Sequence, residues 1–171
     1  ILPEPGLGGF VLPHHSPFER QSVAAMAETP VVGLRRWLVA SFNEPDRAIR
    51  RDLRWVHPLI GLGPGLTPSG SDFLGGMMIA LQVLGASRMT YRLWRTVRNC
   101  ALEMDNPIVL AHLEAAAEGL GSAAVHDALS AILTNGTERL GDAAVGLASV
   151  GHTSGWDAMA GVVTPIDAWL E

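Results

Sequence analysis

The sequence contains no lysine and a single cysteine, and only 17% of its 171 residues are charged. Because Cys100 has no partner, the chain cannot form an internal disulfide. The sequence also lacks a long hydrophobic run: its most apolar stretch, residues 73–86, contains Gln82 and is shorter than the ~20 residues that cross a bilayer. The first five residues, ILPEP, have neither the basic start nor the apolar segment of a signal peptide. We therefore expect a cytoplasmic protein without a membrane span.

Positive charge is scarce as well. All twelve basic residues are arginine, and seventeen Asp and Glu residues outnumber them, which gives a net charge of -5 and a pI near 5.6. Nucleic-acid-binding domains usually carry a basic stripe, so this balance argues against that class. Apolar residues make up 48% of the chain and its mean hydropathy is +0.24. This excess predicts a surface buried against another subunit, in a homo-oligomer or a hetero-oligomer.

The sequence predicts a mostly α fold with a single multi-helix domain. Residues 1–15 are rich in Pro and Gly, so we expect an extended or irregular lead-in, with the helical domain spanning residues 16–171. Residues 61–70 are also rich in Gly and Pro and form a candidate ligand loop. Capping residues, prolines and C-terminal glycines predict helices that start at Ser16-Pro17 and Thr29-Pro30, and helices over 44–55, 71–85, 88–103, 107–118, 123–133, 138–150 and from 156 onward.

A short motif occurs twice. Residues 65–76 read GLTPSGSDFLGG and residues 151–161 read GHTSGWDAMAG. Both contain Ser-Gly-x-Asp-x-x-x-Gly preceded by Gly and Thr, and each lies where a loop leads into a predicted helix. The repetition indicates that the two segments adopt related local structures.

The repeated motif has two interpretations. In the first, Ser69 and Ser154 cap their helices and complete capping boxes with Asp72 and Asp157. In the second, the two helix N-termini converge on one pocket, where unpaired N–H groups and the helix dipoles favour an anion. Two facing carboxylates in its wall can orient an amine or amide, bind Mg²⁺ or share a proton.

The second interpretation assigns roles to side chains and glycines of both motifs. Backbone N–H groups of the motif glycines, including Gly70 and Gly155, hold the anion, and nearby hydroxyls contact it. His152, inside the second motif, is either a proton donor or a solvated loop residue, and the histidines form no i, i+4 pair typical of a metal site. The candidate catalytic residues are Asp72, Asp157 and His152, and the candidate ligand-binding residues are Gly63, Pro64, Gly65, Thr67, Ser69, Gly70, Ser71, Thr153, Ser154 and Gly155, with no metal ligands assigned.

The stretch GLGPGLTPSGSDFLGG, residues 61–76, resembles the signature of a bacterial family that includes a subunit of oxamate carbamoyltransferase, the AllH type. The second motif resembles that family's later SG-x-D segment, and the resemblance covers about residues 58–165. It implies carbamoyl transfer between a phosphate and an amide nitrogen, in company with other subunits. Two features depart from the family: Ser71 stands where it usually has Asp, and the region ahead of Gly61 is shorter, so residues 1–15 are expected to be the remnant of a longer N-terminal region.

The sequence therefore predicts a subunit of a carbamoyltransferase-like enzyme that binds a small anion at two helix N-termini. The ligand classes are phosphate, carbamoyl phosphate and an oxamate-like molecule. Because no residue stands out as a nucleophile or general base, two alternatives remain open. One is a non-catalytic subunit that senses a metabolite in the same pocket, and the other is a structural helical subunit in which the repeat only caps helices.

Overall fold

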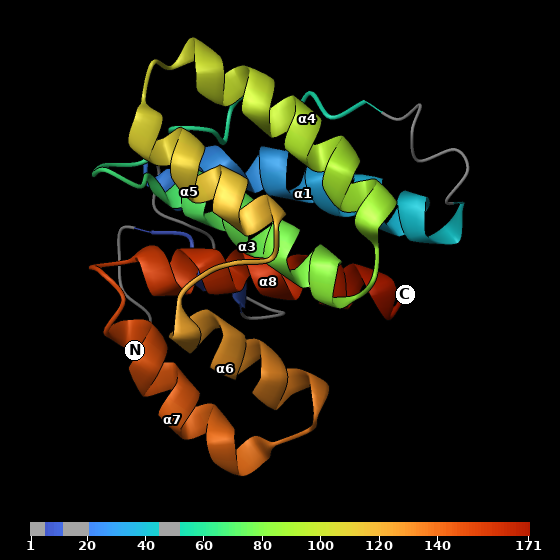
Figure 1. The fold of residues 1–171 in the computed structure, drawn as a ribbon, viewed down its shortest axis with the longest axis vertical. Coiled ribbons are helices and arrows are strands. Elements are labelled where there is room, and N and C mark those ends of the chain that lie inside the picture. Colours follow the sequence, from blue (N-terminus) through green and yellow to red (C-terminus); the bar gives the residue numbers. More distant parts are fainter. Residues whose placement is uncertain (1–5, 12–20, 45–51) are drawn as a thin grey trace.

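A computed structural model describes residues 6–11, 21–44 and 52–171 (Figure 1). Within these ranges the chain forms α-helices and one short 3-10 helix, without a strand, which confirms the predicted mostly α domain. The elements are η1 (Gly8–Val11), α1 (Val23–Asn43), α3 (Ser69–Val83), α4 (Ser87–Glu103), α5 (Pro107–Ala117), α6 (Ala123–Leu133), α7 (Thr137–Ala148) and α8 (Ser154–Trp169). None of these helices is long and apolar enough to span a bilayer.

Helix α3 lies at the centre of the molecule and is buried along its first thirteen residues, Ser69 to Leu81. Helix α8 crosses α3, and helices α4 and α5 pack against α3 from another side. Helix α1 and the short η1 pack against α8, and α6 and α7 form an antiparallel hairpin beside it (Figure 1). The two helices that carry the repeated motif therefore form the core of the fold.

Two glycines bring α3 and α8 into backbone contact. A Cβ atom at Gly76 of α3 would overlap the carbonyl oxygen of Ala158 in α8, and one at Gly161 of α8 would overlap the carbonyl oxygen of Phe73 in α3. When the two motifs are aligned, Gly76 matches Gly161 and Phe73 matches Ala158. The contact is therefore reciprocal, and the start of α3 and the start of α8 are related by an approximate two-fold axis.

The N-terminal half of the chain departs from the sequence-based expectations. Helix α1 runs without interruption through Pro30, so the predicted helix start at Thr29-Pro30 is wrong; its N-cap is Ser22, whose hydroxyl accepts the Ala25 N–H at 3.0 Å. Pro30 is buried on the core face of α1, where packing offsets the missing helical hydrogen bond. The predicted helix start at Ser16-Pro17 lies outside the described residues.

Other differences concern the two segments on either side of α1. Of the helix predicted over residues 44–55, residues 45–51 lie outside the described part, and residues 52–55 form coil and turn instead of helix. In the predicted irregular lead-in, Gly8–Val11 form one turn of 3-10 helix. From residue 69 onward the helices lie within about two residues of their predicted positions, and Asn106 caps α5 as predicted, accepting the N–H groups of Ile108 and Val109 at 3.1 and 3.2 Å.

Candidate functional site

The Gly/Pro-rich loop before α3 is shaped by three glycines with positive φ. Gly61, Gly63 and Gly65 have φ values of +73°, +108° and +94°, a region that other residues rarely adopt. Gly63 lies against the start of α3, since a Cβ there would be 3.1 Å from the Ser69 nitrogen, whereas Pro64 and Gly65 are exposed. The glycines of this loop therefore set the path of the chain into α3.

The two motifs enter their helices in the same register. Helix α3 begins at Ser69 after the N-cap Pro68, and α8 begins at Ser154 after the N-cap Thr153, and neither N-cap residue makes a side-chain capping bond. Both serines are thus first helical residues, and both aspartates occupy the fourth helical position. The capping-box interpretation is therefore wrong, because it needs the serine one position earlier.

The glycine that follows each serine packs against backbone. The N–H of Gly70 donates to the Leu62 carbonyl at 2.9 Å, and the N–H of Gly155 donates to the Val150 carbonyl at 3.1 Å. A Cβ at either glycine would also overlap a carbonyl oxygen of the preceding segment. The expectation that these two N–H groups hold an anion is therefore wrong, since both donors are already bonded within the chain.

Ser71 also has a structural role. It is fully buried, and its Oγ accepts the N–H of Gly61 at 3.1 Å, which fastens the loop to the first turn of α3. Ser71 does not line the cavity described next.

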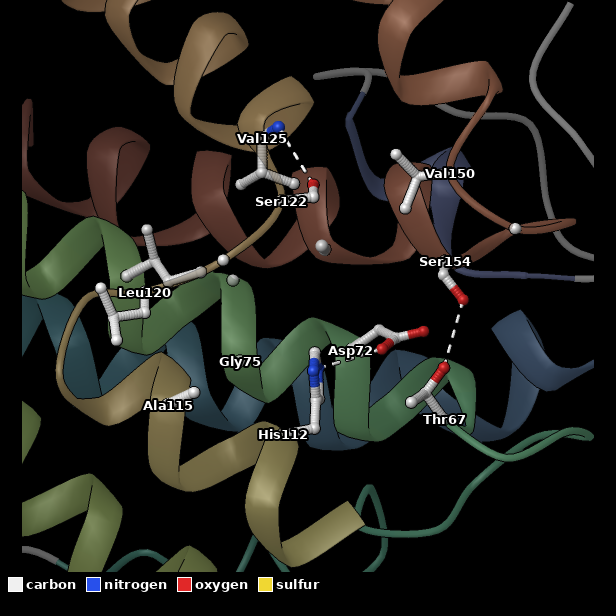
Figure 2. A pocket seen from close by; sticks show the side chains of 15 residues that line it. Thr67, Asp72, Gly75, His112, Ala115, Leu120, Ser122, Val125, Val150 and Ser154 are labelled. Atoms are coloured by element: carbon white, nitrogen blue, oxygen red, sulfur yellow. Dashed lines mark hydrogen bonds and ion pairs between the residues drawn. The ribbon is translucent and has the colours of Figure 1, made fainter. Parts of the chain in front are cut away.

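A cavity of about 580 Å³ lies beside the crossing of α3 and α8 (Figure 2). Thr67 and Asp72 reach it from the first motif, and Ser154 reaches it from the second. The Thr67 and Ser154 hydroxyl oxygens are 3.4 Å apart, so they link the two motifs at one end of the cavity. The remaining walls come from α3, α5, α6, α8 and the segments before α6 and α8. They are largely apolar: Ile79, Ala115, Leu120, Val125, Val150 and Ala158.

Asp72 and His112 lie within ion-pair distance of each other in the wall of this cavity. The His112 Nε2 atom is 3.2 Å from Asp72 Oδ1, and His112 comes from α5 (Figure 2). Gly75 makes room for the imidazole, because a Cβ at that position would be 3.3 Å from Nε2. Asp72 is only 2% exposed, and its second oxygen, Oδ2, is buried without a hydrogen-bond partner, as is Nε2 of His112. A buried acceptor without a partner is costly, so a ligand that donates a hydrogen bond would be favoured there.

Asp157, the counterpart of Asp72, has different neighbours. Its Oδ1 accepts the backbone N–H of Leu7, from the segment that precedes α1. The pKa of its carboxyl is raised, mainly because burial disfavours the charged form, and the charge of Asp72 raises it further. Hydrogen bonds from Leu7, Thr153 and Ser69 act in the opposite direction. The two aspartates are thus close enough to interact, but Asp157 is fully buried and does not line the 580 Å³ cavity.

The structure therefore brings together only part of the predicted site. Thr67, Asp72 and Ser154 share the cavity, whereas Ser69 and Asp157 are buried in a separate cluster with the half-buried Thr153. His152 is exposed in the loop before α8 and does not line the cavity. The other predicted residues that do not line it are Gly63, Pro64, Gly65, Gly70, Ser71 and Gly155.

His112 is the site residue that the sequence did not reveal. It lies at the sixth position of the helix PIVLAHLEAAA, where a polar side chain follows five residues without charge. Its only sequence signal is its position after five uncharged residues in a helix whose one other charged or polar residue is Glu114. The contact with Asp72 identifies His112 as a site residue, and this contact forms only in the folded protein because Asp72 lies 40 residues earlier in the chain.

The described part of the chain contains no group of three His, Cys, Asp or Glu side chains arranged as a metal site. In the comparisons with known proteins, a family model described as "Oxamate carbamoyltransferase subunit AllH" matches residues 59–166. No curated protein and no solved structure matches the chain. The family match covers more than half of the chain and both motifs, so the chain belongs to this family.

Proposed function

From this family membership, we propose that the chain is the amide-binding subunit of a carbamoyltransferase, and that an oxamate-like molecule binds in the cavity beside α3 and α8. The observation that carries the proposal is the unpartnered Oδ2 of Asp72, which is buried in the cavity wall. A primary amide is a suitable ligand for this atom because its NH₂ group donates hydrogen bonds and accepts none. The family name links the same class of molecule, oxamate, to the reaction.

The rest of the cavity fits the other end of such a ligand. In the proposed orientation, the amide nitrogen donates to Asp72 Oδ2, and the ligand carboxylate accepts from the hydroxyls of Thr67 and Ser154. His112 acts as a positioning residue, since its contact with Oδ1 orients the carboxylate of Asp72 and leaves Oδ2 toward the ligand. Asp157 and His152 have no contact with the ligand in this proposal.

Phosphate and carbamoyl phosphate fit the cavity less well. Its ionisable lining residues are Asp72 and His112, and none of the described residues that line it is an arginine. A phosphate dianion usually needs bidentate or multiple cationic partners. We therefore place the carbamoyl donor with another subunit of the enzyme. During transfer, the amide nitrogen would attack the carbamoyl carbon, the bond from that carbon to the phosphate oxygen would break, and Asp72 would take the proton that the nitrogen loses.

The test compares oxamate with oxalate, which has a similar size but no N–H donor, by NMR titration of the folded chain. We expect oxamate to bind more tightly than oxalate. Asp72→Asn should weaken oxamate binding about ten- to a hundredfold, because a hydrogen bond to a charged group is worth about 1.5–3 kcal/mol. The matched control is Asp142→Asn, at an exposed aspartate of α7 that does not line this cavity. Equal binding of oxamate to the wild type and to Asp72→Asn would refute the assignment.

The same cavity supports a second candidate function, a non-catalytic subunit that senses the metabolite. This alternative is favoured by the lack of an arginine for the carbamoyl donor among the described lining residues. A ligand-induced rise in Tm without turnover, persisting after the remaining subunits are added, would support sensing. Turnover that appears when the subunits are mixed, and that is lost in Asp72→Asn, would support catalysis.

A further inference from the structure

We propose that the carboxylate of Asp157 is the hydrogen-bond acceptor of a second amide-binding site, and that the chain's own Gly6–Leu7 peptide group occupies this site. The ligand class of this second site is a small amide, the same class as in the cavity at Asp72. The choice of ligand rests on the proposed function, whereas the existence of the site rests on the symmetry of the two helices.

The first step of the argument is the equivalence of the two aspartates. Asp72 and Asp157 both occupy the fourth position of a helix, and these helices cross through reciprocal glycine contacts. The serine that starts each helix lies beside the aspartate of the other one: Ser69 lies close enough to Asp157 to influence its pKa, and Ser154 lines the cavity together with Asp72. The approximate two-fold axis therefore relates two similar environments, each with a carboxylate and a hydroxyl from the opposite helix.

The second step is what fills the environment at Asp157. The backbone N–H of Leu7 donates to Asp157 Oδ1, and Leu7 itself is fully buried. Gly6 lies directly on the carboxylate, since a Cβ at Gly6 would overlap Asp157 Oδ1 and come within 2.8 Å of the Thr153 Cβ. The peptide group between these residues is a secondary amide, so the chain presents to Asp157 the same functional group that the proposed ligand presents to Asp72.

The third step concerns the atom that this internal amide leaves unpaired. A peptide group has one N–H, which Asp157 Oδ1 accepts, and Oδ2 of Asp157 remains buried without a partner. A primary amide has two N–H donors and can satisfy both oxygens. A primary amide therefore competes with the Gly6–Leu7 segment, and binding at Asp157 requires this segment to move away.

The main experiment removes the internal donor from the full chain. Leu7→Pro lacks the backbone N–H, and Gly6→Ala keeps it but places a methyl group against the carboxylate. Folding of both variants is checked by far-UV CD, and oxamate is then titrated while the backbone signals of Thr153 and Asp157 are followed by ¹H–¹⁵N NMR. Acetamide, which has no carboxylate, serves as a second probe.

We expect oxamate to shift these signals in Leu7→Pro or Gly6→Ala, the opened variants, at concentrations that leave the signals unchanged in the wild type. Adding Asp157→Asn to the same variant should abolish the shift. Unchanged signals in both folded variants would overturn the proposal. If neither variant folds, hydrogen exchange of the Leu7 amide in the wild type tests the proposal. Competition predicts that this amide exchanges about tenfold faster when oxamate is present at ten times the Kd of the second site. An unchanged exchange rate up to the solubility limit of oxamate overturns the proposal.

The two proposals fail in distinguishable ways. Signals of Thr67 and His112 report the cavity at Asp72, and signals of Thr153 and Asp157 report the second site. Shifts confined to the first pair in the opened variants would refute the second site alone. Shifts confined to the second pair would refute the proposed function and leave the inference standing.

Discussion

Replacing Gly161 by alanine should separate the two central helices and destabilise the protein. A Cβ at this position would overlap the carbonyl oxygen of Phe73 and lie 3.0 Å from the nitrogen of Met77. Both neighbours are backbone atoms of α3, so no side-chain rotation can relieve the overlap. The helices must move apart, which loosens the packing of the buried side chains around the crossing.

The magnitude follows from two opposing effects. Overpacking of a core costs about 1–3 kcal/mol, and a contact with backbone belongs at the upper end of this range. Alanine in a helix interior gains about 1 kcal/mol over glycine. The net loss for Gly161→Ala should therefore be about 2 kcal/mol, which corresponds to a Tm lower by about 4–8 °C for a domain of this size.

The matched control is Gly141→Ala in α7. A Cβ at Gly141 would have no neighbour within 4 Å, so this variant should show the gain in helix propensity alone, with a Tm about 2–4 °C higher. Gly76→Ala should resemble Gly161→Ala because the contact is reciprocal. The double variant should lose less than the sum of the two, because the first alanine already separates the helices.

Thermal and urea unfolding, followed by far-UV CD, measure these differences. A Gly161→Ala variant as stable as the wild type, beside a stabilised Gly141→Ala, would refute the close crossing of α3 and α8. It would also remove the basis for the two-fold relation between Asp72 and Asp157, since that relation depends on the same glycines.

Two further predictions concern buried polar groups near the crossing. The pKa of Asp157 is raised in the folded state, so the stability that it contributes is fully present below its unfolded pKa near 3.8 and is lost as the pH rises through its folded pKa. Asp157→Asn should remove this part of the pH dependence of the unfolding free energy, measured by urea unfolding from pH 4 upward. An unchanged profile would contradict the prediction. Ser71→Ala should leave the Gly61 N–H without its acceptor and cost about 1–2 kcal/mol in the same assay, and a loss below about 0.3 kcal/mol would show that this hydrogen bond does not hold the loop.

The sequence predicted the helices of the C-terminal two thirds well because their boundaries carry strong local signals. Asn106 before Pro107, for example, is an N-cap followed by the residue favoured at the first helical position, and the structure has this arrangement. The prediction failed at Pro30, where the same local signal lies inside a longer helix. Burial of that face of α1 decides the outcome, and burial is a property of the whole fold that the local sequence does not contain.

The candidate site was predicted only in part for a similar reason. The repeated motif correctly indicated two related helix starts, but it did not show that the glycines serve helix packing or that their N–H groups are already bonded. Nor could it show that Asp72 pairs with His112, while Asp157 pairs with the Leu7 amide. These partners come from α5 and from the N-terminal segment, and neither has a fixed sequence spacing from the motif.

The crossing of α3 and α8 also sets the order in which the protein can be assembled on the ribosome. Helix α8 begins 85 residues after α3, so the glycine face of α3 has no partner while the intervening helices are being made. Contacts between segments so distant in the chain form late and slow folding. Until α8 is made, the face of α3 that α8 covers has no partner, and apolar surface exposed in this way can bind chaperones or other nascent chains.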